Sequence, residues 1–151
     1  MNVLGVRCSN KDFTYAVLSG TKKSPVQETL YAVAFPKGYA KPQSLRWLLL
    51  EIDGLITKHQ IKSIVIKSSE GMTRGKAFAD RVQHEAAVQI AGATRGLKAV
   101  FEKVKSTMAK DLGQKGRAHY LAQLDTSNFP DYDSHSEKEQ EAILAAWSGL
   151  T

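Results

Sequence analysis

The chain has 151 residues, 42% of them hydrophobic, and its 21 Lys and Arg outnumber 15 Asp and Glu for a formal net charge of +6. The composition is that of a globular protein, with one domain expected over residues 1–151. The single cysteine, Cys8, excludes an internal disulfide framework, and no apolar run reaches the roughly 18 residues of a membrane span, so we expect a cytoplasmic protein.

The first elements are predicted to be strands. Residues 2–7 and 12–19 form an antiparallel pair around the turn formers of residues 9–12, and a third strand covers about 27–35. The continuous apolar run within 62–66 indicates a strand buried on both faces.

Helices alternate with strands in the rest of the chain. Apolar residues at helical spacing predict a helix over about 43–59. A second helix, about 76–91, is predicted to end at Gly92 and Gly96. The strand near 99–104 precedes a short helix capped by Ser106 or Thr107, and a last helix opens with a Ser136–Glu139 capping box. The inner stripe of the second helix is expected to hold Phe78, Val82, Ala86 and Ile90.

The resulting order, βββ-α-β-α-β-α-α, predicts an α/β fold, a mixed five-stranded sheet with helices on its faces. Two of its central strands end on a cation: residues 3–6 lead into Arg7, and residues 64–66 lead into Lys67. Ligands of open α/β sheets bind beyond the carboxyl ends of the strands. We therefore expect an anionic ligand there.

The loop that follows the fourth strand adds further positive charge. Lys67, Arg74 and Lys76 stand in it or at its end, and Arg81 follows about two helical turns after Arg74. A loop before a helix N-terminus can hold phosphate through backbone N–H groups and the helix dipole. An ordinary solvated loop is the alternative interpretation. The histidines have no metal-ligand spacing, and His84 is expected on the surface.

This order of elements resembles the RuvC-type Holliday junction resolvases of the ribonuclease H-like superfamily. The resemblance is carried by LGVRCSNKDFTYAVL (4–18), SIVIKSS (63–69), AVFEKVKSTMAKDLG (99–113) and SEKEQEAILAAWSG (136–149). The residues Met72-Thr73-Arg74-Gly75-Lys76 are also similar to a small uncharacterised bacterial RuvC-like family. The resemblance implies a ribonuclease H-like fold and two-metal hydrolysis of a phosphodiester, in which several carboxylates hold the ions.

At the positions where the resemblance implies metal-binding acids, this chain has mostly cations. Arg7, Lys67 and Lys138 stand at three of them, and Glu141 keeps the fourth. A cation about 4 Å from a divalent ion costs several kcal/mol at a surface-like dielectric. We therefore expect a pseudo-nuclease without bound metal.

Three hypotheses follow for the function. The first is a non-catalytic protein that binds DNA or RNA through phosphate contacts. The second is a protein-interaction scaffold or homodimer that uses a helix face. The third is a divergent nuclease that uses Mg²⁺ or Mn²⁺ with Glu70, Glu137 and Glu141. The phosphate contacts of the first hypothesis are assigned to Arg7, Lys67, Arg74, Lys76 and Arg81.

Overall fold

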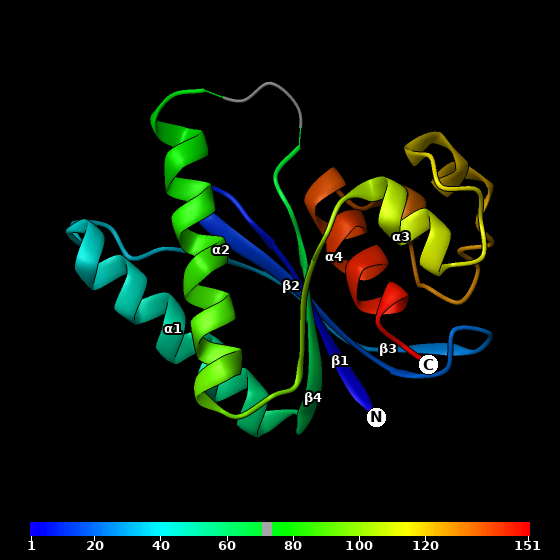
Figure 1. Ribbon diagram of the computed structural model, residues 1–151, viewed down its shortest axis with the longest axis horizontal. Coiled ribbons are helices and arrows are strands. Elements are labelled where there is room, and N and C mark those ends of the chain that lie inside the picture. The colour runs from blue at the N-terminus through cyan, green and yellow to red at the C-terminus, as the bar shows by residue number, and fades with distance from the viewer. Residues whose placement is uncertain (71–73) are drawn as a thin grey trace.

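A computed structural model describes residues 1–70 and 74–151 and contains the predicted mixed sheet (Figure 1). Its strand order is β3-β2-β1-β4-β5. β1, β2 and β3 are antiparallel neighbours, whereas β4 and β5 run parallel to β1. The strands are β1 (Asn2–Cys8), β2 (Asp12–Gly20), β3 (Pro25–Ala34), β4 (Ile61–Lys67) and β5 (Ala99–Lys103).

Helices cover both faces of the sheet, as predicted. α1 (Lys41–Lys58) and α2 (Lys76–Thr94) pack on one face, which carries Leu4, Val6 and the fully buried Cys8. α3 (Lys105–Asp111) and α4 (Glu137–Ser148) lie on the other face with two short 3₁₀ helices, Ala118–Gln123 and Tyr132–Ser134 (Figure 1). No helix among the described residues is long and apolar enough to cross a membrane.

The backbone of α4 lies directly on β1 at Gly5. A Cβ atom at Gly5 would overlap the carbonyl oxygen of Ala142 and lie 2.5 Å from the Ala146 nitrogen. Gly5 is therefore required by close packing, and the contact places the first turns of α4 beside the carboxyl end of β1. The predicted capping box begins this helix: the Glu139 amide donates to Ser136 Oγ at 3.2 Å, and the Ser136 amide donates to Glu139 Oε1 at 3.1 Å.

The prediction that Phe78, Val82, Ala86 and Ile90 form the inner face of α2 is wrong. Val82 and Ile90 are 42% and 55% exposed. The helix also continues past Gly92, where a Cβ would lie 2.7 Å from Val100 Cγ2, so this glycine allows close packing and does not end the helix. The face that meets the sheet combines small and polar residues: His84, Glu85, Ala87, Val88, Ala91 and Gly92.

His84 is buried, contrary to the surface position expected for it. Its Nδ1 lies 2.8 Å from the Ser9 carbonyl oxygen, and its Nε2 lies 3.4 Å from Lys41 Nζ. Burial lowers the pKa of His84, so a neutral ring bridges α2 to the β1–β2 turn. α3 also departs from expectation, because its N-cap is Val104 and neither Ser106 nor Thr107 caps it.

Candidate nucleic-acid interface

Arg7 at the end of β1 points toward α4 and is held by Glu141. Its Nε donates to Glu141 Oε2 at 2.8 Å, and its Nη1 donates to the Cys8 carbonyl oxygen at 2.6 Å. The two side chains are only 15% and 6% exposed. Alternation along β1 puts Arg7 on the same face as Gly5. The α4 backbone at Gly5 thus brings Glu141 within reach of Arg7.

Lys67 at the end of β4 has its own acid partner. Its Nζ lies 2.6 Å from Glu70 Oε2 and donates to the Ser68 carbonyl oxygen at 2.6 Å. The side chain is 3% exposed. Burial alone would raise the pKa of Glu70, but hydrogen bonds from Lys67 and from the Lys105 amide outweigh it and lower that pKa. Glu70 is therefore ionised at neutral pH.

A third pair joins α4 to β2. Lys138 Nζ lies 3.1 Å and 3.2 Å from the two carboxylate oxygens of Asp12. Burial alone would raise the pKa of Asp12. Hydrogen bonds from Ser9 and Lys138 outweigh this effect and lower the pKa. Each cation that stands at an expected metal-ligand position is thus matched with a carboxylate of this chain.

The three acids of the nuclease hypothesis do not make a metal site. Glu137 and Glu141 face Lys105, whose Nζ lies 3.6 Å and 3.8 Å from them, while Glu70 accepts from Lys67. Within residues 1–70 and 74–151, no group of three or more His, Cys, Asp or Glu side chains is arranged to hold a metal ion. The residues present do not fit the two divalent ions that the RuvC resemblance implies, because Arg7 and Lys67 already neutralise the available carboxylates.

Beside these pairs lies a hollow of about 450 Å³, which we call the cationic hollow. It brings together Arg7, Arg74 and Arg81 from the predicted contact set, and it adds Lys138. Arg81 is fixed there, with Nε donating to Glu85 at 3.0 Å and Nη2 to the Lys67 carbonyl oxygen at 3.2 Å. The complete lining is Arg7, Ser9, Asn10, Arg74, Ala77, Phe78, Arg81 and Lys138, without a carboxylate.

Two other predicted contacts lie outside this lining. Lys67 is buried and Lys76 is exposed, and neither lines the hollow. Lys138 was identified from sequence as a replaced acid and not as a phosphate contact. Its place in the lining beside Arg7 depends on how α4 packs on β1. Met72 and Thr73 of the second resemblance lie outside the described residues.

The strand order and the helices on both faces give the arrangement of a ribonuclease H-like fold. No protein-family model and no curated protein sequence matches the chain. Its fold is RuvC-like: T. thermophilus RuvC in complex with a Holliday junction substrate is similar with a TM-score of 0.76 at 9% identity, over 98% of this chain and 91% of that chain.

Two further solved structures have the same fold. Another T. thermophilus RuvC structure is similar with a TM-score of 0.74 at 11% identity, over 98% of this chain and 92% of that chain. The yeast mitochondrial Holliday junction resolvase Ydc2 is similar with a TM-score of 0.62 at 13% identity, over 97% of this chain and 76% of that chain. These likenesses confirm the predicted mixed α/β fold.

Proposed function

We propose that this chain is a non-catalytic nucleic-acid-binding protein that contacts backbone phosphates with its cationic hollow. The observation that carries the proposal is the convergence of Arg7, Arg74, Arg81 and Lys138 on one hollow with no carboxylate in its lining. Phosphate contacts by Lys and Arg supply most of the affinity of nucleic-acid binding that does not depend on sequence. The RuvC-like fold supports a nucleic-acid partner, since one similar structure holds a Holliday junction.

The proposal excludes hydrolysis because of the ion pairs at the ends of β1 and β4. Two-metal hydrolysis requires carboxylates that converge on both ions. Here the carboxylates of Glu141 and Glu70 are neutralised by the guanidinium of Arg7 and the ammonium of Lys67, which stand in place of metal ions. A divalent ion about 4 Å from either cation would be repelled by several kcal/mol. We assign no cofactor to the protein and place its action in the cytoplasm.

The test is the salt dependence of binding to labelled branched and linear duplex DNA and to RNA, measured by fluorescence anisotropy. If all four cations contact phosphate, for which Arg7, Arg81 and Lys138 must leave their acid partners, log K falls against log salt with a slope of about −3.6 on duplex DNA, and fewer contacts give a shallower slope. Arg74→Gln and Lys138→Gln should each weaken binding about threefold to tenfold at about 50 mM salt and make the slope shallower by about 0.9. No cleavage is expected with Mg²⁺ or Mn²⁺.

Lys62→Gln is the matched control, because Lys62 is exposed at the opposite end of β4. Absence of binding at low salt, or equal effects of the Lys62 and Arg74 variants, would contradict the proposed interface. Metal-dependent cleavage that Glu70→Gln abolishes would instead establish the nuclease hypothesis.

A second candidate function is self-association through the apolar stripe of α2. Val82 and Ile90 are exposed, and beside them α1 and α2 form a mostly apolar groove of about 340 Å³ that includes Leu45 and Leu49. Exposed apolar surface of this kind marks interaction sites. We assign the groove to a second copy of the chain. Sedimentation velocity should then give a dimer that Ile90→Asp converts to monomer; a monomeric parent protein would contradict it.

A further inference from the structure

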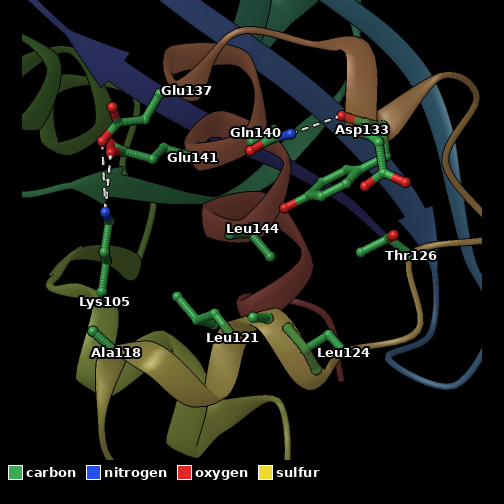
Figure 2. Close-up of a pocket in the computed structure, with 12 residues that line it drawn as sticks. Lys105, Ala118, Leu121, Leu124, Thr126, Asp133, Glu137, Gln140, Glu141 and Leu144 are labelled. Carbon is green, nitrogen blue, oxygen red and sulfur yellow. Dashed lines mark hydrogen bonds and ion pairs between the residues drawn. The ribbon is translucent and has the colours of Figure 1, made fainter.

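A second concavity lies on the α4 side of the sheet, and its lining differs from that of the cationic hollow. It has a volume of about 380 Å³, within the range of small-molecule sites. α4 forms one wall, α3 and the Ala118–Gln123 helix form the opposite wall, and the segment from Leu124 to Asp133 closes one end (Figure 2).

This cavity has carboxylates at its two ends, with leucines and Gln140 between them. Leu121, Leu124 and Leu144 line one side of the space between the ends, and Gln140 of α4 lies between Glu141 and Asp133 (Figure 2). Figure 2 shows Glu137 and Glu141 together at one end, with Asp133 at the other. The lining therefore contains three carboxylates and one ammonium, in a protein whose formal net charge is +6. Electrostatically, the cavity selects for cations where the rest of the surface favours anions.

The acids at the Lys105 end still have room for a donor. Lys105 Nζ lies 3.6 Å from Glu137 Oε1 and 3.8 Å from Glu141 Oε1, and both distances are longer than a hydrogen bond. Arg7 holds the other carboxylate oxygen of Glu141 from the far side. A hydrogen bond with Glu141 and the charge of Lys105 lower the pKa of Glu137.

The separation of the acids determines the shape of the cation. Among the described residues, these carboxylates form no cluster that could enclose a metal ion. A compact ion at either end would leave the leucines between the ends uncovered. A ligand with an ammonium group at each end and a chain of methylenes between them satisfies both ends and buries its apolar part.

We propose that this cavity binds a linear aliphatic diamine, with one ammonium between Glu137 and Glu141 and the other at Asp133. The methylene chain lies against Leu121, Leu124 and Leu144. Lys105 competes with the first ammonium for the same carboxylates. The cavity adjoins the cationic hollow through the Arg7–Glu141 pair but shares none of its lining residues, and the proposal does not rest on nucleic-acid binding.

The experiment titrates the full chain with hexamethylenediamine, without nucleic acid, by calorimetry and by NMR of the leucine methyl groups. Saturable binding with shifts at Leu121, Leu124 and Leu144 is expected. Hexylamine, which has one ammonium, should bind about tenfold more weakly, since one charge-assisted hydrogen-bonding group is lost. Hexanediol, which has the same chain length and no charge, should not compete.

Variants separate this site from general attraction of cations. Asp133→Asn should weaken diamine binding about tenfold, whereas Asp131→Asn, two residues away and outside the lining, should leave it unchanged. Lys105→Met should tighten binding about threefold or more, because it removes the competing ammonium. A purely structural role of Lys105 would not produce this gain. Circular dichroism confirms that each variant is folded.

Three results would overturn the proposal. They are the absence of saturable diamine binding, equal affinity of the Asp133 and Asp131 variants, and methyl shifts that miss the leucines of the cavity.

Discussion

Replacing Gly5 with alanine is expected to lower the free energy of unfolding by about 3 kcal/mol, the upper range for overpacking a filled core. The added Cβ would overlap the Ala142 carbonyl oxygen and crowd Ala146. Both are parts of the α4 backbone, so no side-chain rotamer can relieve the overlap. α4 has to move away from β1, and the packing of Val3, Ala142 and Ile143 is loosened with it.

Gly54→Ala is the matched control and should change stability in the opposite direction. Gly54 lies within α1, and nothing lies within 4 Å of a Cβ built there. Alanine is favoured over glycine in a helix interior by about 1 kcal/mol. Urea unfolding followed by tryptophan fluorescence measures both variants. A Gly5→Ala protein as stable as the parent would show that α4 does not pack on β1 as described.

Glu141→Gln is the second substitution with a large expected effect, a loss of about 3 kcal/mol in unfolding free energy. The change keeps the side-chain volume but leaves the Arg7 guanidinium, 15% exposed, without its counter-charge. Breaking a buried ion pair from one side is costly because the remaining charge is uncompensated. Lys105 loses one of its two acid partners as well.

The control is Glu137→Gln one turn earlier on α4. The Glu137 side chain is 74% exposed, so the loss in unfolding free energy should stay within about 0.5 kcal/mol. Combining Arg7→Met with Glu141→Met should restore much of the stability, because apolar pairs often replace buried ion pairs at little cost. Equal stability of the Glu141 and Glu137 variants would mean that the Arg7 pair contributes nothing.

The local patterns of this sequence predict the elements and the sheet well. Short apolar runs flanking the turn formers of residues 9–12 identify β1 and β2, and the Ser136–Glu139 capping box places the start of α4. α2 is the exception. Its apolar stripe through Val82 and Ile90 has the expected period but faces outward, because the helix buries His84 and Glu85 through hydrogen bonds that no periodicity reveals.

The candidate site was predictable in part. The cations Arg7 and Lys67 at the strand ends could be identified from sequence, and so could the basic loop that supplies Arg74. Their partners could not, because Arg7 meets Glu141 and Lys138 meets Asp12 across separations of 134 and 126 residues. The burial of Lys67 also depends on tertiary packing. Pairing over such distances is a property of the assembled sheet and α4.

The contact of α4 with β1 also affects how the newly synthesised chain folds. It joins residues near opposite ends of the sequence, with Arg7 and Glu141 134 residues apart. Contacts at such separation form slowly, because long loops must close first. Until α4 docks, the sheet face that carries Val3 and Val65 is open to water. The chain is therefore most vulnerable to proteases and to aggregation while it emerges from the ribosome, and the docking of α4 ends that interval.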